Sequence, residues 1–212
     1  QEMRLPRLVI ALTVGAALAV AGALMQGITL NPLAAPDILG VNMGAAAAVV
    51  AATFLGWGGP ATLPWFAFAG ALVTSVLVYL MGSFGRSGAT PLKLTLAGVA
   101  VSAFLGALMS VAHLLNEEGF ERLRVWLAGT LAGRDQDVFL MALPYLATGF
   151  AIALLVARQI TALGLGADVA RGLGIHTVRL KLVALASVVL LCGAAVTVTG
   201  QIGFIGLVVP HM

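Results

Sequence analysis

The stretch LVALASVVLLCGAAVTVTGQIGFIGLVVP, residues 182–210, contains no Asp, Glu, Lys or Arg. Four further runs share this property, namely residues 8–36, 38–85, 94–116 and 138–157. About 20 consecutive apolar residues suffice to cross the hydrocarbon core of a bilayer. The pattern therefore predicts an all-α protein, a polytopic transmembrane helical bundle that forms a single domain over residues 1–212.

Composition excludes a soluble globular domain, because 61% of the residues are hydrophobic and only 9% are charged. The net charge of +3 arises from residues in the gaps between the apolar runs, where Lys and Arg commonly flank membrane spans. Nucleic-acid binding is therefore not expected, and membrane lipid is the expected surrounding. The single cysteine, Cys192, cannot form an intramolecular disulfide and is interpreted as a packing residue.

About six spans are expected, near residues 8–26, 38–55, 61–81, 94–115, 138–157 and 182–199. Gly200–Gly203 should interrupt the last helix, and residues 204–209 are too few to cross. A half helix is tolerated at that depth only where protein buries it. Small residues recur every four positions and predict close helix packing in the first two spans: Gly15, Ala19 and Ala23, then Gly40, Gly44 and Ala48.

Ion-coupled carriers usually keep a charged group near the membrane midplane. None is expected here, since the apolar runs contain no Asp, Glu, Lys or Arg and Asp37 is counted among the residues of a loop. The pathway is expected to be wide and uncharged, and uphill transport would draw its energy from a partner. A secondary transporter that coordinates sodium through backbone carbonyls stays open as an alternative.

Motifs for other functions are missing from the sequence. It has no Walker-type glycine loop, no His-Glu-x-x-His pair and no Gly-x-Ser-x-Gly elbow, which disfavours an ATPase or an intramembrane hydrolase. The histidines, His113, His176 and His211, lack the spacing of metal ligands. We therefore expect no enzymatic activity, no resident metal and no cofactor.

The loop at residues 158–181 predicts a short helix of about two turns between two spans. Asp168 is a candidate N-cap, and a Gly-Leu-Gly sequence should stop the helix. Val169, Leu173 and Ile175 could form its apolar side. Such a helix either lies at the membrane interface or docks into a groove of a soluble partner. The residues of this candidate coupling helix are Asp168, Val169, Ala170, Arg171, Gly172, Leu173, Gly174 and Ile175.

Four passages together resemble one family, the permease subunits of ATP-binding-cassette importers for iron-siderophore complexes, haem and cobalamin. The passages are Arg4–Arg7 with the helix that ends at Gln26, Asn31–Val41, Asp168–Ile175, and Gly200–His211. The second passage looks most like ferric-citrate and hydroxamate permeases. Gln201 departs from the proline common at its position in the family.

The resemblance implies a ten-span subunit of the inner membrane, of which this chain would be an internal piece without the first and last spans. Its implied partners are an ATPase subunit, a second permease subunit and a periplasmic or lipoprotein substrate-binding protein. The implied cargo is a ferric siderophore, with cobalamin or haem as alternatives. Basic residues divide almost evenly between the two sides, so orientation rests on the resemblance, which places residues 158–181 in the cytoplasm.

Site residues follow from the same resemblance. Arg4 and Arg7 occupy the position that meets acidic residues of the binding protein, although anchoring at the membrane edge is an alternative role. Two cytoplasmic turns are candidate gates, and both could be plain turns because Asn-Pro and Thr-Pro form turns readily. The gate residues are Asn31, Pro32 and Leu33 in the first turn, and Thr90, Pro91 and Leu92 in the second.

Overall fold

The computed structural model describes residues 4–57, 59, 62–85, 90–115, 128–130 and 136–212. These residues form helices joined by short turns, without a β-strand among them, which confirms the all-α prediction. The long helices are α1 (Arg4–Thr29), α3 (Leu63–Ser83), α4 (Pro91–Leu115), α6 (Gln136–Gly164) and α8 (Thr177–Thr199). The shorter ones are η1 (Pro36–Leu39), α2 (Val41–Phe54), α7 (Ala167–Gly172), α9 (Ile205–Val208) and η2 (Val209–His211).

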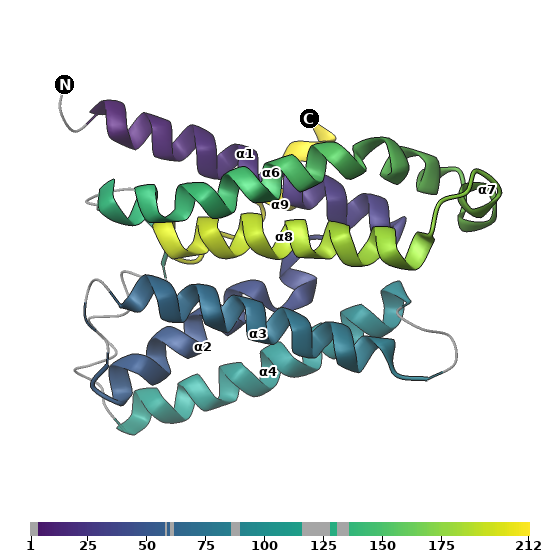
Figure 1. The fold of residues 1–212 in the computed structure, drawn as a ribbon. Helices are drawn as coiled ribbons and strands as arrows, with labels where there is room; N and C mark the ends of the chain where they lie inside the picture. Colours follow the sequence, from purple (N-terminus) through teal and green to yellow (C-terminus); the bar gives the residue numbers. More distant parts are fainter. Residues whose placement is uncertain (1–3, 58, 60–61, 86–89, 116–127, 131–135) are drawn as a thin grey trace.

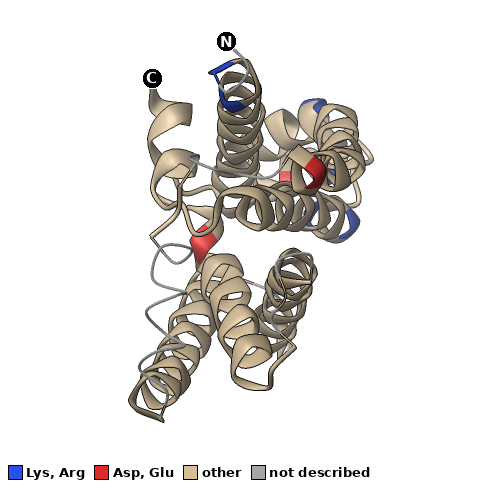
Figure 2. Ribbon diagram, turned by 90° about the vertical axis from the view of Figure 1, so that its left-hand side faces the viewer, with Lys and Arg blue, Asp and Glu red and all other residues tan. Residues whose placement is uncertain are grey.

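The helices lie in two groups that run roughly parallel or antiparallel to one another (Figure 1). One group holds α1, α6, α8 and α9, and the other holds α2, α3 and α4. Helix α8 joins them, because it packs against α1 and α6 on one side and against α3 on the other. Most of the ribbon is free of charge when viewed along the helices (Figure 2). Five of the described helices are long and apolar enough to cross a membrane.

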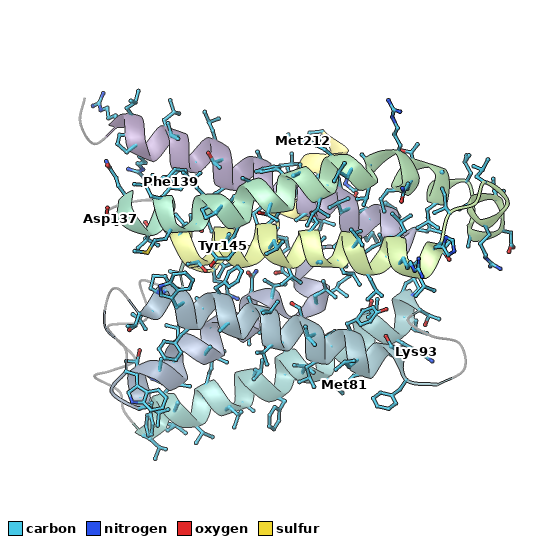
Figure 3. The ribbon with its side chains drawn as sticks, in the orientation of Figure 1. Met81, Lys93, Asp137, Phe139, Tyr145 and Met212 are labelled. Atoms are coloured by element: carbon cyan, nitrogen blue, oxygen red, sulfur yellow. The ribbon has the colours of Figure 1, made fainter. Side chains whose placement is uncertain are left out.

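One polar contact joins α8 to α6, and aromatic contacts join α6 to α3. Ser187 donates a hydrogen bond of 2.7 Å to the backbone oxygen of Gly149, which ties α8 to α6. Tyr145 of α6 points toward α3 (Figure 3), where its ring lies 4.8 Å from that of Phe68 and 6.2 Å from that of Trp65. A buried serine that bonds a neighbouring helix contributes only about 0.6 kcal/mol on average in membranes, so the apolar contacts carry most of the packing.

The second predicted span is wrong in its length. The sequence predicts one crossing over residues 38–55, but the chain first makes the 3₁₀ turn η1, and α2 starts only after Gly40, whose φ is +67°. Helix α2 therefore has only 14 residues. Charge counting cannot detect such a break, since Pro36 and Gly40 interrupt a helix without adding charge.

Small residues bring helices together at some of the predicted positions and not at others. A Cβ atom on Gly44 would collide with the backbone of Gly70 in α3, which confirms close packing there. In α1 the expected stripe is wrong, because a Cβ atom added to Gly15 would have no neighbour within 4 Å and Ala23 is exposed. The close approach in α1 occurs instead at Gly22, against Gly206 of α9.

Candidate functional site: a short helix and a broken membrane segment

The short helix α7 is built by glycines at both ends. Gly166 precedes it at φ +114°, and Gly174 follows it at φ +81°. The Gly174 amide donates to the Arg171 oxygen at 2.9 Å, and the Ile175 amide donates to the Ala170 oxygen at 3.0 Å. This pair of bonds is a Schellman motif, so the predicted Gly-Leu-Gly stop is confirmed.

One detail of the predicted helix, its N-cap, is wrong. Asp168 is not the N-cap, since Gly166 occupies that position, whereas the six residues of the helix agree with the predicted length of about two turns. The Asp168 carboxylate instead lies 3.0 Å from the Arg171 guanidinium, one turn further on. Both side chains are exposed, so the pair adds at most about 1 kcal/mol to stability.

The apolar residues of this segment divide between an inner and an outer side. Ala170 is fully buried and Ile175 packs against the core, which anchors the helix to the bundle. Val169 is 48% exposed and Leu173 is 65% exposed. Ile175 therefore does not belong to the exposed apolar side expected from the sequence, whereas Val169 and Leu173 do.

An open groove of about 510 Å³ lies where α7 turns into α8. It is lined by Arg171, Gly174, Ile175, His176, Thr177, Val178 and Arg179. Sequence reasoning ended the candidate helix at Ile175 and so missed His176 and Arg179. The signal that could have found them is the start of α8, where exposed polar residues precede the apolar run.

Arg4 and Arg7 lie in the first turn of α1, and both are exposed. Their three-residue spacing places them on one face of the helix. They stand at the end of the bundle opposite α7 (Figure 1). The structure thus places two exposed positive charges at the end of α1 that lies away from α7.

The two candidate gate turns lie at the α7 end of the bundle (Figure 1). In the first, the Leu33 amide donates to the Asn31 side-chain oxygen at 2.9 Å, and Leu33 and Pro32 are exposed. In the second, Thr90 accepts a bond of 3.4 Å from the Lys93 amide. Pro91 occupies the first position of α4, followed by the 69%-exposed Leu92. Each turn thus has a local structural role, and gating by either remains a prediction.

The end of α8 is broken as predicted. Gly200 closes the helix at φ +78°, and Phe204 adopts φ +67°, which is rare for a bulky residue. Helix α9 then runs beside α1, where the Gln26 amide donates to the Leu207 oxygen at 3.5 Å. Gln201 makes a weak contact of 4.0 Å with the Met43 sulfur.

Asp37 is the functional candidate that sequence reasoning missed. It lines a small recess together with Leu18 of α1, Cys192 of α8 and Gly206 of α9. Leu18 and Cys192 lie away from the ends of α1 and α8, so this carboxylate lies level with the inner parts of two helices that are long enough to span a membrane. The expectation of a midplane without charge is wrong, because η1 folds back into the bundle and carries Asp37 with it.

No cluster of three potential metal ligands occurs among His, Cys, Asp and Glu in the part of the chain that the structure describes. Cys192 is buried in the core, in agreement with a packing role.

Comparison with known proteins agrees with this architecture. The chain is 45% identical over 213 residues to the ferric enterobactin permease FepD of Escherichia coli K12. It is 44% identical over 211 residues to the Fe(3+)-citrate import permease YfmD of Bacillus subtilis strain 168. The two matches include 100% and 99% of this chain, respectively. The chain spans only 64% of the length of FepD and 62% of the length of YfmD.

A solved structure described as an inward-facing conformation of a metal-chelate type ABC transporter superposes with a TM-score of 0.88 at 31% identity. That match covers 99% of this chain and 67% of the solved chain. The FecCD transport family matches residues 1–212 without interruption. Because this match extends over the whole length of the chain, the chain belongs to the FecCD transport family.

Proposed function

We propose that the chain forms part of the permease subunit of an ATP-binding-cassette importer that moves ferric-siderophore complexes across the cytoplasmic membrane. The match of the FecCD family to all 212 residues carries this proposal. The permeases FepD and YfmD, named for ferric enterobactin and ferric citrate, support an iron chelate as cargo. Haem and cobalamin are the alternative cargoes.

The chain would act through its partners. An ATPase subunit would bind the α7 end, where Leu173 and Val169 offer an exposed apolar surface on a rigid helix. A binding protein would dock at the opposite end, on Arg4 and Arg7. A second permease subunit would complete the passage, with the two turns at Asn31–Leu33 and Thr90–Leu92 as gates.

The test is uptake of radiolabelled substrate, with labelled iron in the ferric chelates and haem and labelled cobalt in cobalamin, by proteoliposomes that contain the permease, its ATPase and its binding protein. Ferric hydroxamate, ferric citrate, haem and cobalamin are compared at equal concentrations. We expect ATP-dependent uptake of at least one iron chelate and none with an ATPase that cannot hydrolyse ATP. Uptake only of haem or cobalamin would contradict the proposed cargo.

Asp37 makes a secondary transporter worth testing in the same vesicles, because carboxylates deep in the membrane often couple transport to ions. Vesicles without ATP receive a proton or sodium gradient. Iron uptake driven by either gradient would contradict the ATP-driven mechanism. We expect none.

A further inference from the structure

The open groove of about 510 Å³ where α7 turns into α8 carries positive charge on both of its walls. Arg171 belongs to α7 and Arg179 to α8, and no Asp or Glu is among the residues that line the groove. Arg179 makes no ion pair with any residue that the structure describes, whereas Arg171 shares its guanidinium with Asp168. A guanidinium has five N–H donors, so Arg171 keeps donors for a second anion. The groove therefore offers two guanidinium groups to a negatively charged ligand.

The start of α8 adds to this positive character. His176 is the N-cap residue, and Thr177 and Val178 follow it in the first turn. Amides in the first turn of a helix have no partner within the helix, and the helix dipole adds partial positive charge there. Thr177 and Val178 both line the groove, so backbone amides as well as side chains can bond an anion. Phosphate suits both kinds of donor, because arginine binds it bidentately and helix N-termini bind it through their amides.

The level of the groove along α8 matches the headgroup layer of a membrane. Lys181 is the last charged residue before the charge-free run 182–210. Arg179 precedes Leu182 by three residues, which corresponds to about 4.5 Å along a helix. The headgroup layer is about 5–8 Å thick on each side of the hydrocarbon core. Arg179 therefore lies at the level of lipid phosphates.

An exposed apolar strip leads from the groove along α8 toward the hydrocarbon core. Val178 is 67% exposed, and Leu182 and Val183 are each 44% exposed. Residues four apart lie on one face of a helix, so Leu182 follows Val178 one turn deeper, and Val183 follows Arg179. A soluble anion would leave this strip bare, whereas the acyl chains of a lipid would cover it.

We propose that the groove binds an anionic glycerophospholipid, with its phosphate at Arg171 and Arg179 and its acyl chains along Val178 and Leu182. Basic pockets beside membrane helices commonly bind anionic headgroups. Val169 and Leu173, the residues of α7 proposed to contact the ATPase, do not line the groove. The lipid would thus join α7 to α8 on side chains that the ATPase does not need. The inference does not depend on the cargo.

The test uses the full-length permease together with its ATPase, purified in an uncharged detergent. Binding of fluorescent phosphatidylglycerol is compared with that of phosphatidylcholine bearing the same label and acyl chains. We expect one saturable site per permease subunit and an affinity for phosphatidylglycerol at least about tenfold higher than for phosphatidylcholine. Equal affinities, or the lack of a saturable site, would overturn the inference and leave the proposed function intact.

Substitutions then locate the site. Arg179→Gln should weaken phosphatidylglycerol binding about fivefold, and Arg171→Gln combined with Arg179→Gln about thirtyfold. Arg179→Lys retains the charge and should keep most of the affinity. Arg158→Gln is the matched control, since Arg158 is exposed near the end of α6 but does not line the groove. The midpoint of thermal unfolding without lipid checks that each variant is folded.

A loss of binding in Arg158→Gln as large as in Arg179→Gln would show that the lipid responds to net charge and not to the groove. Unchanged binding in the double variant would refute the inference directly.

Two further measurements separate the lipid from other occupants. Inorganic phosphate should displace the lipid no better than sodium chloride of the same ionic strength, and specific displacement by phosphate would indicate a site for a free anion instead. Lipid binding is also measured with and without the ATPase subunit. We expect the same affinity in both cases. Loss of the lipid when the ATPase is added would assign the groove to the ATPase interface and overturn the inference.

Discussion

At the scale of single residues, Gly22 and Gly206 bring α1 and α9 into backbone contact. A Cβ atom on Gly22 would collide with the backbone of Gly206, which cannot move aside like a flexible side chain. Gly22→Ala should therefore destabilise the protein by about 1–3 kcal/mol, the usual cost of overpacking. The midpoint of thermal unfolding in detergent measures the effect.

Gly15→Ala is the matched control, since no atom lies within 4 Å of its added methyl group. Alanine favours a helix over glycine by up to about 1 kcal/mol, so this variant should be as stable as the parent or more so. Equal destabilisation by the two substitutions would show that the α1–α9 contact does not depend on Gly22.

The sequence predicts single-residue roles well where they depend on local backbone and poorly where they depend on distant neighbours. Gly174 ends α7 as expected, because its positive φ is a local requirement. Gly22 could not be chosen over Gly15 without knowledge of α9. The sequence places Asp37 in a loop, because its true depth depends on how η1 folds between α1, α4 and α9.

At the scale of elements, α7 combines an inner anchor with an exposed apolar side. Leu173→Glu should leave the fold intact, because the side chain is 65% exposed, and should uncouple ATP hydrolysis from uptake. A central apolar contact at an interface contributes about 2 kcal/mol or more to binding. If Leu173 makes such a contact with the ATPase, its loss should lower uptake at least about tenfold. ATPase activity and iron uptake are measured in the same proteoliposomes.

Leu165→Glu is the control for this prediction, since Leu165 is 71% exposed and lies just before α7. It carries the same change of charge and should retain coupling. If Leu173→Glu transported iron as well as the parent does, α7 would be an interfacial helix and not the coupling element.

Most elements could be predicted because apolar runs and their ends are local properties. Both ends of α3 and the end of α8 lie close to their expected positions, whereas α8 starts earlier, at Thr177 and not near residue 182; the interruption after Thr199 is confirmed. The sequence predicts helix α2 but not its short length, because the break at Gly40 lies inside a run without charge. The groove beside α7 also escaped prediction, since it forms where two elements meet.

At the scale of the whole molecule, the two ends of the bundle present different surfaces. Arg4→Glu combined with Arg7→Glu should weaken capture of the binding protein at low salt. Each exposed ion pair contributes about 0.2–1 kcal/mol, so the dissociation constant should rise between about twofold and thirtyfold. The effect should diminish at high salt because exposed charges are screened.

Arg158→Glu combined with Arg179→Glu makes the same change of charge in the last turns of α6 and the first turn of α8, on either side of α7, where both arginines are exposed. This control should leave the affinity for the binding protein unaltered. Surface plasmon resonance at two ionic strengths measures both variants. Unchanged binding by the Arg4 and Arg7 variant at low salt would leave these residues with an anchoring role only.

The shortness of α2 has a consequence for how the protein enters the membrane during synthesis. Its 14 residues span about 21 Å, well below the roughly 30 Å of a hydrocarbon core. Alone, it would leave unpaired helix ends in lipid. We therefore expect the translocon to release α2 and α3 together as a hairpin, in which the two helices are in contact at Gly44 and Gly70. The order of insertion would then depend on a contact between helices and not on hydropathy alone.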